Sequence, residues 1–396
     1  MQYRVLEKLG YKISALSFGA MRLPTSFALA VDKKKAVATI RKAVELGINY
    51  FDTAYIYHLG ASEKVLGEAL GNGVRKNVYI ADKLPMILMR KTEDFDRFLE
   101  TQLERLGTDY IDFYLFHNLN QGYFDKLLAL GLFEKMEQAK KRGLIRHIGF
   151  SFHDTLPVFK KIVDAYPWDL AQIQYNYLDT AMQATTEGLH YAAKKKIPVA
   201  VMEGLKGGML ADPPKEAKDI MRSAASKKTP VEWAFQFLWN LPEVATVLSG
   251  MGSPAMVEEN CGYAERSGVG ILSGSDMETI EKLVSTYRKK ILVDCTACRY
   301  CMPCPYGVNI PDNFAMLNNA NGRGGIIGWL LLRRYKKFAV RPDKVNKEDP
   351  DGAASLCTKC GVCVKKCPQS INIPEELTRV DMVMGRGKRI SDVFQR

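Results

Sequence analysis

The chain has 396 residues, of which 47% are hydrophobic and 25% are charged, and its formal net charge is +12. This composition excludes a disordered chain, a collagen-like chain and a small disulfide-stapled protein, and the length predicts about two domains. The longest apolar run, Gly325 to Leu332, is too short to cross a bilayer. The first residues lack the apolar core of a secretory signal, so we expect a soluble, cytoplasmic protein with no membrane span.

Short runs rich in β-branched and aromatic residues alternate with amphipathic segments over roughly the first 260 residues. The predicted strands are 16–20, 48–52, 78–83, 110–117, 145–151, 170–176, 197–202 and 244–250. The predicted helices are 33–46, 62–70, 93–106, 127–141, 156–165, 187–195 and 230–239. Eight strand-helix units in about 250 residues predict an α/β fold, a (β/α)8 TIM barrel. An open doubly wound sheet is the alternative. Residues 3–13 alternate around a glycine turn and predict a hairpin that plugs the barrel floor.

Four ionisable residues lie at or just after the ends of three successive predicted strands: Asp52, Tyr57, Lys83 and His117. The carboxyl ends of barrel strands form the rim that carries chemistry in this fold. A free tyrosine has a pKa of about 10, and a neighbouring ammonium lowers it by stabilising the phenolate. Lys83 can supply that charge, Asp52 can keep it ionised, and His117 can orient a substrate oxygen. The four residues therefore predict a proton-donor site for carbonyl reduction.

The motifs around these residues resemble the aldo-keto reductase superfamily. They are Phe51-Asp52-Thr53-Ala54-Tyr55-Ile56-Tyr57, Ile80-Ala81-Asp82-Lys83 and Asp109-Tyr110-Ile111-Asp112, followed by His117. The resemblance runs from about residue 3 to residue 262. It implies an NAD(P)(H)-linked reduction of an aldehyde or ketone, with Tyr57 as the general acid. Tyr55 is a weaker candidate for that role, because it lies in the same loop but off the family position.

The same resemblance implies a set of cofactor contacts: Gly19, Met21, Arg22, Ser151, Gln174, Met202, Ser249, Gly250, Glu259 and Asn260. Phe152 stands where the family usually has an asparagine. Met202 replaces an aromatic residue, and its thioether can still pack on the nicotinamide. Met256 occupies the usual position of the arginine that grips a 2′-phosphate. Lys206, Lys227 and Lys228 are possible substitutes for that charge, so NADPH, NADH and a bound flavin all stay open.

Eight of the nine cysteines lie between residues 295 and 367. They form two runs, Cys295, Cys298, Cys301 and Cys304, then Cys357, Cys360, Cys363 and Cys367, each followed by proline. These spacings are typical of ferredoxin domains with two [4Fe-4S] clusters, in which the fourth cysteine of each run binds the other cluster. The pattern assigns Cys295, Cys298, Cys301 and Cys367 to one cluster, and Cys357, Cys360, Cys363 and Cys304 to the other. Two zinc sites are the alternative, although zinc sites usually use widely separated cysteine pairs.

The cysteine segment predicts a second domain, mostly helical and ferredoxin-like, over residues 294–396, after an aldo-keto reductase barrel over residues 1–293. Residues 271–293 predict the last barrel helix or a bridge between the domains. Residues 326–337 resemble the helical insert of some reductase iron-sulfur subunits and are expected to pack on a neighbouring domain. Cys261 is interpreted as a buried small apolar residue. Reduced, metal-bound thiols indicate an anaerobe, or a cell that keeps this protein away from oxidants.

Residues 295–396 hold 17 Lys and Arg against 9 Asp and Glu. Metal-bound thiolates would balance this excess, so we expect no nucleic-acid binding. A docking face for an acidic electron carrier, such as a ferredoxin or flavodoxin-like protein, or for a partner redox subunit, fits the charge better. The favoured hypothesis is an oxidoreductase for a small-molecule carbonyl substrate that is coupled to electron transfer through two clusters. The alternatives are a conventional NAD(P)H carbonyl reductase with structural clusters, and a redox-responsive subunit of a larger complex.

Overall fold

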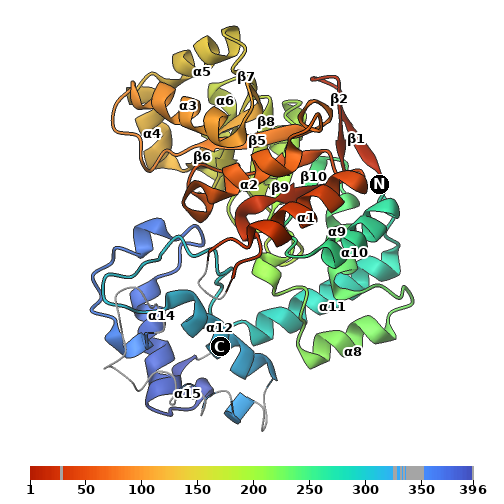
Figure 1. Cartoon of the computed structure of the whole chain (residues 1–396). Helices are drawn as coiled ribbons and strands as arrows, with labels where there is room; N and C mark the ends of the chain where they lie inside the picture. The colour runs from red at the N-terminus through yellow and green to blue at the C-terminus, as the bar shows by residue number, and fades with distance from the viewer. Residues whose placement is uncertain (27–29, 324–327, 331, 333–334, 336–351, 395–396) are drawn as a thin grey trace. The chain divides into compact units, whose positions relative to one another are not determined.

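The structure is a computed structural model that describes residues 1–26, 30–323, 328–330, 332, 335 and 352–394 (Figure 1). The chain forms two compact units. The first contains Met1–Gly204 and Val231–Ser273, and the second contains Leu205–Pro230 and Gly274–Arg396. From the sequence, we expect a domain boundary between residues 293 and 294, and this boundary stays a prediction.

Eight parallel strands close into a barrel in the order β10-β3-β4-β5-β6-β7-β8-β9 (Figure 1). Their bounds are β3 Leu16–Gly19, β4 Tyr50–Asp52, β5 Tyr79–Leu84, β6 Ile111–Leu119, β7 Ile145–Phe152, β8 Leu170–Gln174, β9 Val199–Met202 and β10 Val244–Ser249. Each of the eight predicted strands is confirmed, with ends that differ by at most two residues. Val247 pairs with Leu16 across the closing strands β10 and β3, which excludes an open sheet.

Helices follow most strands and lie outside the barrel (Figure 1). In the first unit they are α1 Lys33–Glu45, α2 Ala61–Leu70, α3 Asp94–Leu106, α4 Gln121–Ala129, α5 Leu132–Lys141, α6 Leu156–Ala165, α7 Thr185–Lys194, α9 Pro230–Trp239 and α10 Pro254–Glu265. Asp32 caps α1 by accepting the backbone N–H of Lys35. The single helix predicted over 127–141 is wrong, because Gly131 has a φ of 60° and separates α4 from α5.

The predicted N-terminal hairpin is confirmed as β1 Tyr3–Leu6 and β2 Tyr11–Ser14, joined by a turn in which Gly10 has a φ of 70°. Leu6 and Ile13 are buried in one apolar cluster with Tyr50, Leu170 and other residues near the amino-terminal ends of the barrel strands. The hairpin therefore closes the barrel floor, as the sequence predicts, and leaves the carboxyl rim for chemistry.

The second unit is mostly helical, as expected. Its elements are the short η4 Lys206–Gly208, α8 Lys215–Ser223, α11 Gly274–Lys290, α12 Ile310–Arg323, η6 Ala354–Leu356, η7 Val364–Lys366, α14 Ile373–Val380, η8 Asp381–Gly385 and α15 Ile390–Val393. The expected helix over 271–293 is confirmed as α11, whereas α8 was not predicted. Most of the expected insert over 326–337 lies outside the described residues.

Val308, Phe314 and Leu377 lie in the buried apolar cluster at the centre of the second unit, together with Cys301. Cys295, Cys304, Cys357, Cys363 and Cys367 are partly buried against this cluster. Apolar burial is the main favourable term in folding, so the core that holds this unit together also positions most of the predicted metal ligands.

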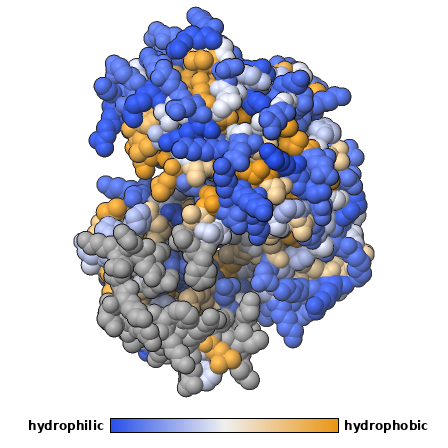
Figure 2. Space-filling view, viewed as in Figure 1, coloured by the Kyte–Doolittle hydropathy of each residue, from blue (hydrophilic) through white to orange (hydrophobic). Residues whose placement is uncertain are grey.

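Hydrophilic residues cover most of the coloured surface in Figure 2, with smaller apolar groups between them. Among the described residues, no helix combines the length and the apolar character that crossing a bilayer requires.

Candidate active site and cysteine centre

The four predicted proton-donor residues lie near the carboxyl ends of neighbouring strands. Asp52 is the last residue of β4, Lys83 is the penultimate residue of β5, and His117 lies two residues before the end of β6. Tyr57 begins the short helix η2, Tyr57–Gly60. All four side chains are buried. Adjacent parallel strands bring their carboxyl ends to one rim, so these residues can meet although they span 66 positions of the sequence.

Lys83 and Asp52 form a buried ion pair. The Lys83 Nζ atom lies 2.7 Å from each oxygen of the Asp52 carboxylate and donates to the Thr53 carbonyl at 2.6 Å. Neither side chain is accessible enough for water to satisfy its charge. The ammonium is therefore held in one position by two fixed acceptors.

Tyr57 lies beside this ammonium and beside His117. The Lys83 Nζ atom is 5.0 Å from the centroid of the Tyr57 ring. The Tyr57 and His117 rings are 5.7 Å apart between centroids and nearly perpendicular, at 83°. Tyr55, the weaker acid candidate, packs elsewhere, against Phe98 at 4.9 Å and under the Arg105 guanidinium at 4.3 Å. The structure thus brings Asp52, Tyr57, Lys83 and His117 together and separates Tyr55 from them.

Burial sets the protonation states around the pair. It lowers the pKa of His117 well below its usual value, and the Lys83 charge and His153 act in the same direction. Burial also raises the pKa of Asp52, while the ion pair with Lys83 and a hydrogen bond from Gln172 oppose that rise. His117 is therefore a neutral imidazole near pH 7, able to hydrogen-bond a substrate oxygen without adding charge.

Two further polar residues of the site were missed by sequence analysis. Gln172, in β8, is hydrogen-bonded to Asp52, and its Nε2 atom lies 3.7 Å from the Met202 Sδ atom. His153 follows β7, and its Nδ1 atom donates a hydrogen bond to the Gln183 Oε1 atom at 3.2 Å. For Gln172, the sequence did contain an indication of its place in the site. Side chains two positions apart on a strand share a face, so Gln172 lies on the same face as Gln174.

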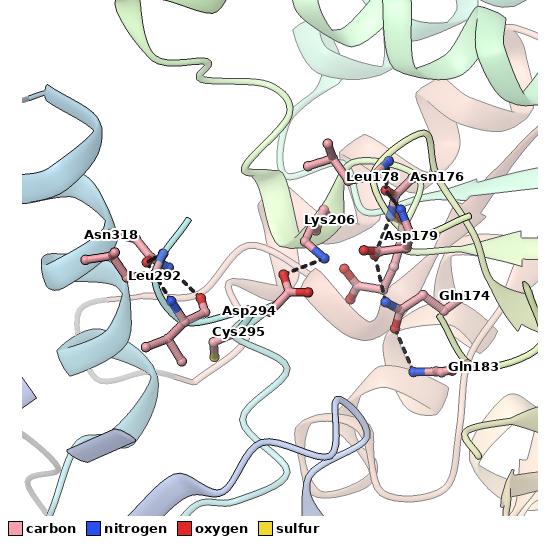
Figure 3. A network of polar contacts seen from close by, with 12 residues as sticks. Gln174, Asn176, Leu178, Asp179, Gln183, Lys206, Leu292, Asp294, Cys295 and Asn318 are labelled. Atoms are coloured by element: carbon pink, nitrogen blue, oxygen red, sulfur yellow. Dashed lines mark hydrogen bonds and ion pairs between the residues drawn. The ribbon is translucent and has the colours of Figure 1, made fainter. Parts of the chain in front are cut away.

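The residues expected to hold a nicotinamide already have protein partners. The Ser151 hydroxyl accepts the backbone N–H of Asn118 at 2.8 Å. Gln174 donates to Asp179 at 2.9 Å and accepts from Gln183 at 3.1 Å, as Figure 3 shows. Phe152, in the usual asparagine position, is buried with its ring 5.0 Å from that of Phe159. The polar network fixes the orientation of Gln174, but its role with a cofactor stays a prediction.

The expected cofactor segments at the other side of the rim meet across β3 and β10. Phe18 pairs with Ser249, and a Cβ atom added at Gly250 would lie 3.1 Å from the Cβ atom of Arg22. Asn260 donates to the Ser249 hydroxyl at 3.4 Å. Gly19 and Met21 lie in the segment that ends at Arg22. The two segments approach each other closely, so a side chain at position 250 would require the Arg22 side chain to shift by a few tenths of an ångström.

No basic residue lies in the first turn of α10, where Met256 is exposed. Glu259 accepts from the Tyr263 hydroxyl at 2.5 Å. The three lysines considered as substitutes have partners inside the second unit. Lys206 pairs with Asp294 at 2.7 Å (Figure 3), Lys228 pairs with Asp276 at 3.1 Å, and Lys227 donates to two backbone carbonyls.

The eight clustered cysteines interact electrostatically in two groups of four, and each group contains cysteines from both runs of the sequence. Burial raises the pKa of Cys301 to about 12, and the neighbouring thiols of Cys298, Cys295 and Cys367 act in the same direction. For Cys363, burial raises the pKa, and its thiol neighbours are Cys357, Cys304 and Cys360. Cys261 is buried apart from them, on α10.

These are the same two sets of four that the ferredoxin pattern assigns, and four thiols are the donor set that one [4Fe-4S] cluster takes. Among the described residues, no three His, Cys, Asp or Glu side chains are close enough to share a single metal ion. The donor chemistry and the grouping of the thiols fit a pair of clusters.

Comparison with known proteins agrees with both parts of the chain. Residues 15–285 match the profile of the aldo/keto reductase family, and residues 294–372 match that of a 4Fe-4S dicluster domain. The chain is 29% identical over 308 residues to L-galactose dehydrogenase of Arabidopsis thaliana, covering 72% of this chain and 93% of that protein. It is 27% identical over 249 residues to a methylglyoxal reductase of Escherichia coli, covering 60% and 84%. A solved aldo-keto reductase from Bacillus halodurans, in its holo form, is 27% identical with a TM-score of 0.61, covering 72% of this chain and 96% of that chain.

Proposed function

The chain belongs to the aldo/keto reductase family and carries a 4Fe-4S dicluster domain, and on that basis we propose how it acts. It is an oxidoreductase. We propose that it reduces a small aldehyde or ketone, or oxidises the corresponding alcohol, with Tyr57 as the general acid. We further propose that this reaction is coupled to electron transfer through two [4Fe-4S] clusters.

The observation that carries the proposal is the position of Tyr57 between a buried ammonium and a neutral imidazole. Its ring centroid is 5.0 Å from the Lys83 Nζ atom and 5.7 Å from that of His117. In reduction, Tyr57 gives its hydroxyl proton to the substrate oxygen, and the Lys83 charge stabilises the phenolate that remains. His117 orients the same oxygen by a hydrogen bond. In oxidation, the Tyr57 phenolate takes the proton back.

A nicotinamide cofactor, NADPH or NADH, would supply hydride when bound at this rim. Ser151, Gln174 and Met202 are the residues that we propose for the nicotinamide half, and Ser249, Gly250, Glu259 and Asn260 for the adenosine half. We also propose contacts from Gly19, the last residue of β3, and from Met21 and Arg22 in the short helix Ala20–Arg22 that follows it. The absence of a side chain at Gly250, close to Arg22, supports a site in which a cofactor can approach the backbone closely.

The cluster ligands that we propose are Cys295, Cys298, Cys301 and Cys367 for one cluster, and Cys357, Cys360, Cys363 and Cys304 for the other. Such clusters transfer one electron each, whereas hydride carries two. A bound flavin, which can take two electrons as hydride and pass them on singly, would resolve this mismatch, and an outside one-electron carrier would then exchange electrons with the clusters. The excess of basic residues in the cluster region supports an acidic protein carrier or a partner redox subunit.

Replacing Tyr57 tests the chemistry. Tyr57→Phe keeps the ring and removes the proton, so carbonyl turnover should fall by about 10²- to 10⁴-fold. Tyr55→Phe is the matched control, because its ring packs against Phe98 and Arg105, and it should retain most of the activity. Normal turnover of Tyr57→Phe, with loss in Tyr55→Phe, would remove Tyr57 from the role of acid.

Anaerobic titration tests the coupling. Iron, sulfide and extracted-cofactor analysis of anaerobically purified protein establishes the cluster content and whether flavin is present. Bleaching of the visible cluster absorbance by NAD(P)H or by a reduced carrier supports coupled electron transfer. Unchanged clusters during normal carbonyl turnover would instead support clusters that only stabilise the fold.

A further inference from the structure

The two groups of cysteines differ in their access to solvent. In the group around Cys301, that thiol is buried, with 9% of the residue exposed, and the other three are partly buried. In the group around Cys363, Cys360 is exposed. A cluster bound by the second group would therefore lie nearer the surface of the second unit than a cluster bound by the first. The distance between such a cluster and an outside electron carrier would be the shorter of the two.

Apolar side chains lie exposed around this outer group. Val362 and Val364 flank Cys363 in the chain and are 45% and 37% exposed. Tyr306, two residues after Cys304, is 49% exposed. Exposed apolar residues are ordinary when scattered, but these three lie within two positions in the sequence of cysteines assigned to one predicted redox centre.

Lysines border the same surface. Lys365 and Lys366 follow Val364 in the short helix η7, and residues 352–370 contain no Asp or Glu. Neither ammonium forms an ion pair with a carboxylate in the described part of the chain. Lys359 is exposed on the other side of Cys360, where it lines a groove of about 490 Å³ that also contains Glu375 and Asp392. The positive charge of the surface therefore comes chiefly from Lys365 and Lys366.

We propose that this outer patch, formed by Tyr306, Val362, Val364, Lys365 and Lys366, docks a small acidic protein that carries one electron at a time. The inference rests on the proposed function, because it assigns the partner's place on the cluster region. A small apolar centre with charged neighbours suits the limited interfaces of transient electron-transfer complexes. The lysines steer an acidic surface toward the patch and raise the association rate. In each encounter the reduced carrier loses one electron and the outer cluster gains it, or the reverse.

The alternative role for these lysines is to offset the negative charge of a thiolate-bound cluster. In that case their replacement would change the cluster itself and would affect every electron donor equally. A docking role affects only protein carriers with acidic surfaces, and it weakens as salt screens the charges. The two roles therefore differ in donor dependence and in salt dependence.

The test uses the anaerobic full-length holoprotein and the variant Lys365→Glu/Lys366→Glu. The matched control is Lys282→Glu/Lys289→Glu, which makes the same change of net charge with two exposed lysines on α11. Stopped-flow absorbance follows cluster reduction by a reduced acidic [2Fe-2S] ferredoxin, and separately by dithionite. No carbonyl substrate is present, so a failure of the Tyr57 chemistry does not affect the result.

We expect the patch variant to accept electrons from the ferredoxin at least 10-fold more slowly at low salt, with the difference shrinking at 0.5 M salt. Its iron content and its rate with dithionite should match those of the parent. Carbodiimide coupling, which joins lysines directly to carboxylates, should link the ferredoxin to Lys365 or Lys366 in the parent protein. Equal slowing in the α11 control, equal slowing with dithionite, or coupling only at other lysines would overturn the proposal.

Discussion

At the residue scale, the Lys83–Asp52 pair combines a structural cost with a catalytic use. Both groups are buried, and removing one partner of such a pair leaves the other charge unpaired in a poorly solvated place. Removing both charges should therefore reduce the stability of the fold less than removing only one of them.

We predict that Lys83→Met lowers the free energy of unfolding by about 3 kcal/mol and abolishes turnover. Adding Asp52→Asn should restore most of the stability, because no charge is then left unpaired, but none of the activity. Urea unfolding followed by the fluorescence of Trp168, Trp233 and Trp239, all buried in the barrel unit, measures the effect. A double variant as unstable as Lys83→Met alone would contradict this interpretation.

One buried histidine, His117, and one partly buried histidine, His153, make stability depend on pH. Burial lowers the pKa of His117 well below 6.5 and that of His153 to about 4. Below pH 6.5, the ordinary pKa of histidine, these residues bind protons in the unfolded chain but not in the folded chain. The free energy of unfolding therefore falls as the pH falls from 6.5 toward 4.

For His153 alone, this linkage amounts to roughly 1 kcal/mol between pH 7.5 and pH 5.5. We therefore predict that His153→Gln loses about 1 kcal/mol less than the parent over this range, as measured by urea unfolding at both pH values. An identical pH slope in parent and variant would show that His153 is not responsible.

Sequence patterns located Asp52, Tyr57, Lys83 and His117 because their chemistry follows from strand ends and spacing. They did not reveal that Ser151 accepts the Asn118 N–H or that Gln174 is held between Asp179 and Gln183. Those partners come from loops whose conformations depend on tertiary packing. Gln172 was overlooked for a different reason, since it lies on β8 and its alternation with Gln174 already places both side chains on one face of the strand.

At the element scale, α2 and α3 approach closely at Gly67. A Cβ atom added there would lie 2.4 Å from the Leu106 carbonyl oxygen, which is backbone and cannot move aside. We predict that Gly67→Ala destabilises the barrel unit by about 1–3 kcal/mol.

The matched control is Gly262→Ala in α10, where an added Cβ atom meets no other atom within 4 Å. That change should leave stability equal or improve it by up to about 1 kcal/mol, since alanine restricts the unfolded chain. Thermal unfolding of both variants measures the contrast, and equal effects would refute the steric argument.

Helix boundaries were the least predictable feature of the elements. The strands followed from their β-branched and aromatic residues, and all eight were found. The break between α4 and α5 depends on the left-handed conformation of Gly131, which the surrounding helical pattern conceals. Helix α8 escaped prediction because its strongly polar sequence offers only Ala217 and Met221 as buried residues.

At the scale of the whole molecule, the grouping of the cysteines predicts how the clusters depend on each run. If the fourth ligands are exchanged between the runs, Cys367→Ser should disturb the cluster of Cys295, Cys298 and Cys301, and Cys304→Ser should disturb the other. Each variant should retain about four of about eight iron atoms.

Iron analysis and low-temperature electron paramagnetic resonance of the reduced proteins distinguish the two remaining clusters. Cys261→Ser, outside both groups, is the control and should keep the full iron content. Loss of the cluster that belongs to the same run as the substituted residue would contradict the exchange of ligands.

The assignment of residues 205–230 to the second unit limits how freely this protein can be recombined. Gly207 lacks a side chain where the Thr296 carbonyl approaches, since an added Cβ atom would lie 2.2 Å from that oxygen. Lys206 pairs with Asp294, directly before the first cysteine of the cluster region. Transplanting that region onto another reductase therefore requires three junctions, one on each side of residues 205–230 and one before Gly274, because a single terminal fusion would leave Lys206 and Gly207 behind.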